Sequence, residues 1–160
     1  MNVIRALLCG EEVTHQGLVT VDRARLYTLP AEPPPLFGAA VTDETARWVG
    51  SWADGLATIH QPREALERVV RAFREGGGEG KPMILQAHLA WAADEETALR
   101  VAHDQWRTNV FAPPLCWDLE TPGHFDEAAK HVTAEQVRDS VLVSGDPSFH
   151  VDWIRAAGER

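Results

Sequence analysis

The sequence has little cysteine and no long apolar run. Its two cysteines, Cys9 and Cys116, lie far apart and form no Cys-x-x-Cys pair, so neither a disulfide framework nor a cysteine-ligated zinc site is predicted. No apolar stretch reaches the roughly 20 residues that a membrane-spanning helix needs. The N-terminus also lacks the basic and apolar regions of a secretory signal. We therefore expect a soluble protein of the reducing cytoplasm.

Positive charge is also in short supply. Fifteen Lys and Arg residues face 24 Asp and Glu residues, which leaves a formal net charge of −9. A chain that neutralises phosphates needs clustered basic residues, so neither nucleic acid nor an anionic membrane is an expected partner. With 160 residues, 44 % of them hydrophobic, the chain is long enough for one compact domain, and we expect residues 1–160 to form it.

Short apolar segments alternate with amphipathic ones through the middle of the chain. Three segments, at 36–41, 56–60 and 83–90, are typical of strands that are covered on both faces. Helices are predicted after them, over 44–53, from Pro62 to the glycines at 76–78, and from Asp94 to Trp106. Repeated strand and helix units predict right-handed crossovers and a parallel sheet.

The two ends of the chain follow other patterns. The first eight residues resemble the last turns of a helix, residues 13–27 indicate a β-hairpin, and the prolines at 30–35 form a stiff connector. Near the C-terminus we expect a loop over 111–119, helices over 125–131 and 133–141, an extended turn over 142–147 and a last helix. The helix faces also place Trp48, Trp52 and Trp106 in the core.

Two motif searches give negative results. The segment Gly76–Lys81 is rich in glycine, but Glu75 and Pro82 occupy positions where a phosphate-binding loop needs Gly and Ser or Thr, so a plain connecting loop is predicted. Seven histidines are present, yet none shows the spacing of metal ligands, and no metal site is predicted. No Gly-x-Ser-x-Gly elbow is present either, so nucleophilic hydrolysis lacks support.

The turn after the first predicted parallel strand contains small residues. Ala40, Val41 and Thr42 lead into a helix, whose first backbone N–H groups can approach an anionic group such as a cofactor phosphate. Asp43 and Glu44 lie in the same first turn and repel an anion. Simple helix capping by Thr42 is therefore the alternative function of this turn.

Some polar and aromatic residues lie where a parallel barrel places its catalytic rim. His60 and His88 each fall at or near the C-terminal end of a predicted strand, where they either face a substrate or satisfy strand-end backbone groups. Trp91 lies at a strand end and Trp117 in a loop. Either tryptophan can flank a flavin ring or plug the mouth of a barrel.

Several segments together resemble a known family. Residues 34–40, 45–48 and 53–55, then 80–91 with the acidic turn at 94–96, resemble the second half of the luciferase-like flavin-dependent oxidoreductases. The segments 105–111 and 116–120 are similar to the branch related to deazaflavin-dependent glucose-6-phosphate dehydrogenases. The resemblance covers nearly the whole chain and implies an α/β fold, a TIM barrel with FMN or a deazaflavin at its C-terminal rim, and a small organic substrate.

The resemblance also has two departures. The sugar-phosphate dehydrogenases hold the substrate phosphate with two lysines and an arginine, and the matching positions here, around His60-Gln61, Cys116 and Ser140, are not basic. A complete barrel of about 250 residues is moreover longer than this chain. We therefore expect a partial barrel that lacks the strands supplying the family's catalytic histidine, so that its own catalytic residues stay unassigned.

These observations lead to one functional expectation and its rivals. The expected function is flavin-dependent oxidoreduction by hydride transfer or with O2, with Ala40, Val41 and Thr42 holding the cofactor phosphate and His60, His88 and Trp117 on the substrate side. The expected partner is a second copy of the chain or a complementing barrel half. The alternatives are a non-catalytic barrel fragment or interaction subunit, and an open-sheet binding module.

Overall fold

A computed structural model describes residues 1–158 and divides the chain into two compact units. The first unit comprises Met1–Thr58 and Pro62–Leu85, and the second comprises Ile59–Gln61 with the residues from Gln86 onward. Sequence analysis expected one domain. Because each unit has its own hydrophobic cluster, the two are described separately, and the single domain stays a prediction.

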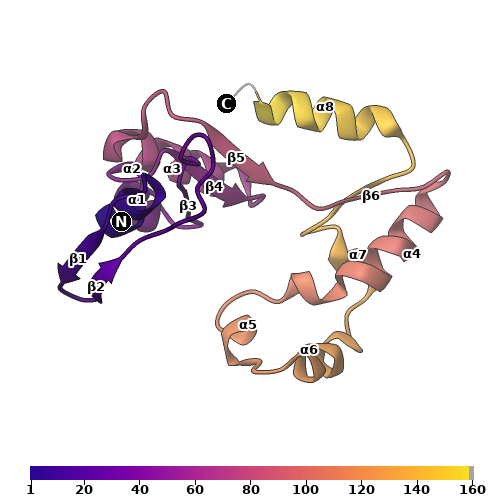
Figure 1. The fold of residues 1–160 in the computed structure, drawn as a ribbon. Coiled ribbons are helices and arrows are strands. Elements are labelled where there is room, and N and C mark those ends of the chain that lie inside the picture. The colour runs from indigo at the N-terminus through magenta and orange to yellow at the C-terminus, as the bar shows by residue number, and fades with distance from the viewer. Residues whose placement is uncertain (159–160) are drawn as a thin grey trace. The chain divides into compact units, whose positions relative to one another are not determined.

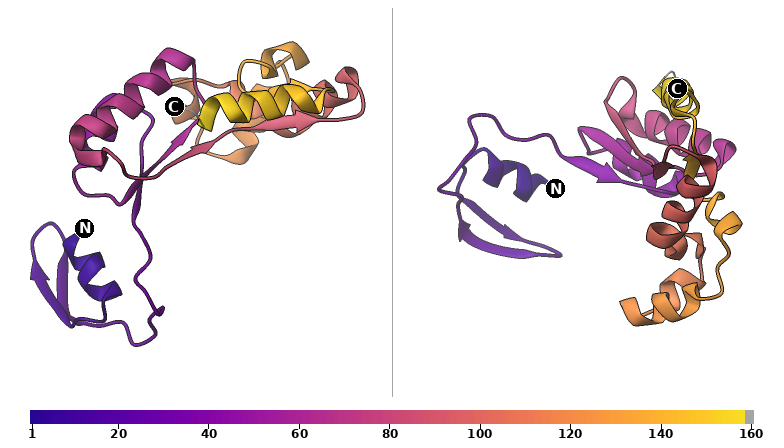
Figure 2. Two further views of the ribbon diagram at one scale, coloured as in Figure 1. Left: turned by 90° about the horizontal axis from the view of Figure 1, so that it is seen from above. Right: turned by 90° about the vertical axis from the view of Figure 1, so that its right-hand side faces the viewer.

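The elements of the first unit follow the predicted alternation (Figure 1). They are α1 (Asn2–Leu8), β1 (Val13–Gln16), β2 (Thr20–Ala24), β3 (Phe37–Ala39), α2 (Asp43–Gly50), β4 (Gly55–Ile59), α3 (Arg63–Phe73), the wide turn η1 (Arg74–Gly78) and β5 (Met83–Gln86). The predicted hairpin is confirmed, because β1 and β2 pair antiparallel. Helix α1 lies beside this hairpin in both views of Figure 2.

The elements of the second unit are shorter and mostly helical. They are β6 (Leu89–Trp91), α4 (Glu95–Trp106), the 3-10 turn η2 (Arg107–Val110), α5 (Leu115–Asp118), α6 (Pro122–Ala129), α7 (Ala134–Val137), β7 (Leu142–Ser144) and α8 (Pro147–Gly158). Strands β6 and β7 pair in parallel, with Ala90 opposite Val143. None of the described helices is long and apolar enough to cross a bilayer.

A three-stranded sheet in the order β3-β4-β5 carries the first hydrophobic core. Strands β3 and β4 are parallel, with Gly38 opposite Leu56, as predicted. Side chains of the sheet and of α2 and α3 form one buried cluster: Ala40, Ala46, Val49, Ala53, Leu56, Val69, Ala72 and Phe73. Full burial of a side chain such as Phe73 contributes about 1.5–3 kcal/mol, so this cluster fixes both helices on the sheet.

The helices α2 and α3–η1 approach each other closely at two glycines. A Cβ atom added to Gly50 would overlap the carbonyl oxygen of Phe73, and one added to Gly76 would overlap the carbonyl oxygen of Arg47. Only glycine allows backbone to meet backbone in this way. The contact therefore fixes the position of α2 on the sheet.

The Asp54 carboxylate connects three segments of the first unit. It accepts hydrogen bonds from Arg5 Nη1 and Nη2 at 2.9 and 2.8 Å, and from the backbone N–H of Leu36 at 2.8 Å. The guanidinium of Arg5 and then the Leu36 amide hold the pKa of Asp54 below its usual range. One side chain thus joins α1 and the entry to β3 to the turn before β4.

The glycine-rich segment continues α3 as the wide turn η1 and then leads into β5. Its lysine, Lys81, donates from Nζ to the carbonyl oxygen of Gly50 at 2.8 Å. This ammonium therefore binds a free carbonyl at the C-terminal end of α2, where the helix dipole favours a cation. Arg47 and Glu75 form an ion pair at 2.6 Å nearby.

Several predicted elements are wrong in extent. The strand predicted over 83–90 breaks at residues 87–88, because its first part pairs in the sheet with β4 while its second part pairs with β7. The turn predicted over 142–147 contains strand β7, and the helix predicted over 133–141 ends at Val137. Short apolar segments carry no periodic signal that separates a turn from a strand, so pairing decided these cases.

The tryptophans expected in the core divide between two environments. Trp48 is 59 % exposed, so its placement in the core is wrong. Trp52 packs against the first hydrophobic cluster and Trp106 against that of the second unit, each only partly buried. Ala46 and Val49 are the residues by which α2 enters the core, and this leaves Trp48 on the outer side of the helix.

The glycine contact predicts a large and local effect of one methyl group. Gly50→Ala should lower the free energy of unfolding by about 2 kcal/mol, because the added Cβ forces the backbone of α2 away from that of Phe73. Urea denaturation followed by circular dichroism measures the change. Gly158→Ala is the control, since a Cβ there meets no atom within 4 Å and should change little. Equal unfolding curves for the two variants would contradict the contact.

The lowered pKa of Asp54 predicts an acid-dependent stability. Its stabilising effect is present above the unfolded pKa of about 3.9 and is lost as pH falls through the lower folded pKa. The melting temperature of Asp54→Asn should therefore lie below that of the parent protein at pH 7, and the gap should shrink below about pH 4. Asp126→Asn, at an exposed position, serves as the control. A gap that stays constant with pH would exclude a role for the charge.

Candidate functional site

The turn between β3 and α2 is built as a helix start. The amide of Ala40 donates to Ala57 O at 3.0 Å, which extends the strand ladder, and Val41 is half exposed. Thr42 is the N-cap of α2, and its Oγ1 accepts from the Thr45 amide at 3.3 Å. The hydroxyl of Thr42 is thus occupied by capping. An anion at this turn would have to bind backbone N–H groups.

His88 is the most constrained of the predicted polar residues. It lies between β5 and β6, and its ring packs on that of Trp106 with a centroid distance of 4.2 Å. His88 Nε2 lies 3.2 Å from the Gln86 amide nitrogen, and His88 Nδ1 lies 3.1 Å from that of Asn109. Its carbonyl oxygen accepts from the Leu142 amide at 2.9 Å. Both the ring and the backbone of this residue are fixed.

The two amides around His88 suit a group that exchanges protons. A neutral imidazole has one donor and one acceptor nitrogen, whereas an imidazolium has two donors. Each side-chain amide offers either N–H or C=O by rotating, so Gln86 and Asn109 can satisfy both protonation states. Both ring nitrogens of His88 are therefore engaged by side-chain amides.

His60 directly follows the C-terminal end of β4, and His88 follows β5, the strand next to β4 in the sheet. Its backbone amide donates to Gln86 O at 2.7 Å, and its ring meets Trp153 edge-on at 5.0 Å. Both histidines thus stand just beyond the ends of neighbouring strands, as the sequence predicted. Beside His60, the Gln61 amide nitrogen is buried and makes no hydrogen bond. Such an orphaned donor is a group that a ligand oxygen can satisfy.

The predicted aromatic residues are more exposed. Trp117 lies on α5 and is 77 % exposed. Trp91 donates from Nε1 to Gly145 O at 3.2 Å. The structure therefore brings the two histidines to neighbouring strand ends, whereas the role of Trp117 on the exposed helix α5 stays a prediction.

Charged groups hold the end of β7 in place. Glu95, at the start of α4, accepts from the Gly145 amide and from Arg138 Nη1, both at 2.8 Å. The Gly145 amide and then Arg138 lower the pKa of this carboxyl group. Within residues 1–158, no group of three His, Cys, Asp or Glu side chains is arranged to hold a metal ion.

A model of the luciferase-like monooxygenase family matches residues 1–160. The chain belongs to the luciferase-like monooxygenase family. It is 31 % identical over 161 residues to an F420-dependent hydroxymycolic acid dehydrogenase of Mycobacterium tuberculosis, covering 96 % of this chain and 43 % of the relative. It is 27 % identical over 164 residues to an F420-dependent glucose-6-phosphate dehydrogenase of Nakamurella multipartita, covering 97 % of this chain and 48 % of the relative.

Solved structures of luciferase-like proteins share the fold. An F420-dependent secondary alcohol dehydrogenase in complex with an F420-acetone adduct matches with a TM-score of 0.81 at 19 % identity, over 99 % of this chain and 50 % of the other. A coenzyme F420 dependent tetrahydromethanopterin reductase from Methanopyrus kandleri matches with a TM-score of 0.69, also at 19 % identity, over 96 % and 51 %. The α/β fold is therefore that of luciferase-like TIM barrels, and the chain spans about half the length of these relatives.

Two residues of the histidine cluster were not predicted. Gln86 and Asn109 are amides in a strand and in a 3-10 turn, within the segments 80–91 and 105–111 that carry the family resemblance, but the sequence analysis gave neither a role. Alternation along β5 could have found Gln86, because it shares a face with the exposed Ile84. Asn109 has no such signal, since only the folding of η2 brings it to His88.

Proposed function

We propose that this chain forms part of a deazaflavin-dependent oxidoreductase that transfers hydride to or from a small organic substrate. The observation that carries the proposal is the His88 cluster at the strand ends, in a chain whose curated relatives are F420-dependent dehydrogenases. These relatives favour a deazaflavin over FMN.

The residues present fit such a cofactor. The turn Ala40–Thr42 has small side chains and precedes the N-terminus of α2, so its N–H groups can hold a phosphate. In the second unit, the orphaned amide nitrogen of Gln61 can donate to a substrate oxygen. When bound, a deazaflavin supplies the carbon that accepts or gives the hydride.

The chain's own residues then handle the proton and the substrate. Oxidation of an alcohol releases a hydride from carbon and a proton from oxygen, and His88 would take that proton on a ring nitrogen once the amide bound to that nitrogen swings aside for the substrate. His60 lines the substrate side beside Gln61. Trp117 belongs there only if α5 closes over a bound ligand.

Cofactor binding should depend on the turn before α2. We expect the purified chain to bind coenzyme F420, and we expect Val41→Glu to weaken binding about tenfold because it adds a negative charge beside a phosphate. A fluorescence titration of F420 measures both affinities, and FMN is titrated in parallel. Val19→Glu, at an exposed hairpin position, is the control. Equal F420 affinity in the parent and Val41→Glu proteins would contradict cofactor binding at this turn.

The sheet edges support a proposal about partners. Strands β3 and β5 are the outer strands of the described three-stranded sheet, and Ile84 on β5 is 52 % exposed. Free edges and exposed apolar side chains favour pairing with another chain. We propose that a second copy or a complementing barrel half covers them.

Light scattering during size-exclusion chromatography tests this partner. The chain alone should run as an oligomer or a mixture and should show no reductase turnover with F420. Ile84→Lys should shift the distribution towards monomer, because a charge on the exposed side of β5 opposes apolar association. Ile4→Lys, on half-exposed α1, is the matched control. A monodisperse 17.7 kDa species with steady turnover would contradict the proposal.

A further inference from the structure

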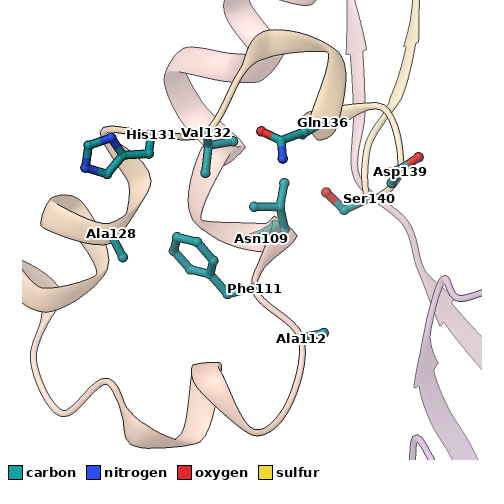
Figure 3. A pocket seen from close by; sticks show the side chains of 10 residues that line it. Asn109, Phe111, Ala112, Ala128, His131, Val132, Gln136, Asp139 and Ser140 are labelled. Carbon is teal, nitrogen blue, oxygen red and sulfur yellow. The ribbon is translucent and has the colours of Figure 1, made fainter.

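A cavity of about 530 Å³ opens in the second unit between η2, α6 and α7. None of the predicted site residues lines it. Figure 3 shows the side chains around it, which come from the end of η2, from α6 and the residues after it, and from α7 and the residues after it. They are Asn109, Val110, Phe111, Ala112, Ala128, His131, Val132, Gln136, Asp139 and Ser140.

One lining side chain presents hydrogen-bond donors to the cavity. Gln136 Oε1 accepts from the backbone N–H of Thr133 at 2.8 Å and from its hydroxyl at 3.1 Å, which forms the capping box of α7. A backbone N–H can only donate, so the oxygen of Gln136 faces Thr133 and its nitrogen faces the other way. Figure 3 shows this nitrogen directed towards the apolar lining side chains. A ligand oxygen in the cavity can accept a hydrogen bond from it.

The charge of the lining disfavours anions. No Lys or Arg lines the cavity, and Asp139 contributes a carboxylate that forms no ion pair within the described residues. The nearby arginine, Arg138, is engaged by Glu95 and Glu135 at 2.8 and 3.0 Å. A phosphate in this cavity would meet a negative charge without a basic partner.

The rest of the lining is apolar and partly rigid. Val110 and Val132 pack against the second hydrophobic cluster, and Phe111 packs against Phe125 with ring centroids 6.2 Å apart. These side chains offer a surface for a hydrocarbon body. Asn109 also connects the cavity to the candidate site, because its amide nitrogen lies 3.1 Å from His88 Nδ1.

We propose that this cavity binds an uncharged organic molecule with an apolar body. Its carbonyl oxygen accepts a hydrogen bond from Gln136 Nε2, its body lies on Phe111 and Val132, and its phosphorylated counterparts are rejected. The assignment of this molecule as the substrate rests on the proposed function, whereas its binding does not.

Two probes with the same body test the ligand class. Cyclohexanone should bind the full chain without cofactor and shift the side-chain amide signals of Gln136 and Asn109 in a nitrogen-proton NMR titration. Cyclohexyl phosphate should bind at least tenfold more weakly, since it adds an anion beside Asp139. Equal affinity for the two probes, or no binding of cyclohexanone by the folded protein, overturns the proposal.

A conservative variant separates the donor from the helix cap. Gln136→Glu keeps an oxygen for Thr133 and therefore keeps the capping box, but it removes the N–H donors. Cyclohexanone should bind about fivefold more weakly, the worth of one hydrogen bond. Gln105→Glu makes the same change at an exposed position outside the cavity and should bind as the parent does.

The outcomes distinguish this proposal from the proposed function. Unchanged cyclohexanone affinity in Gln136→Glu, with circular dichroism equal to the parent, overturns the cavity assignment even if F420 binds. If cyclohexanone binding depends on Gln136 but the chain does not bind F420, the cavity proposal is supported and the proposed oxidoreductase function is contradicted.

Discussion

The contact between the backbones of α2 and α3–η1 is the constraint on which the first unit depends. Gly50 and Gly76 allow carbonyl groups of the neighbouring helix to approach where any side chain would separate the two. Phe73 and Val49 then fill the space between these helices and the sheet, and both are almost fully buried. Because α2 cannot move independently, the turn Ala40–Thr42 at its start has a fixed place at the end of β3. Close packing of the two helices at Gly50 and Gly76 thus determines where the turn Ala40–Thr42 lies.

In the second unit, hydrogen bonds and ion pairs hold the helices and strands in place. Its buried cluster consists mostly of alanine and valine, so each side chain contributes little apolar area. Glu95 joins the start of α4 to the end of β7 and to Arg138, and His88 joins β5 and β6 to η2. The candidate site therefore lies where hydrogen bonds, rather than large apolar side chains, determine the local geometry.

Much of the fold could be predicted because periodicity and helix ends are local signals. Thr42 and Asp94 cap the helices that the sequence placed after them, and the apolar face of α3 is buried as expected. The break at residues 87–88 could not be predicted, because it depends on which partner each half of the segment finds. The histidines were found by their place at strand ends, whereas Asn109 was missed because only tertiary folding brings it to His88. The functions of Ala40, Val41, Thr42, His60, His88 and Trp117 stay proposals.

The backbone N–H of Leu142 donates to the carbonyl oxygen of His88 and so ties the start of β7 to the residue before β6. Between these two residues lie β6, α4, η2, α5, α6 and α7, so the chain leaves from the end of β6 and returns at the start of the parallel strand β7. Insertions, deletions or substitutions in α5, α6 and α7 can reshape the cavity while the β6–β7 register and Asn109 of η2 keep the imidazole in place. Related chains could in this way differ in the shape of this cavity while the contacts of His88 stay the same. The same segment is the natural place to graft new specificity in the laboratory.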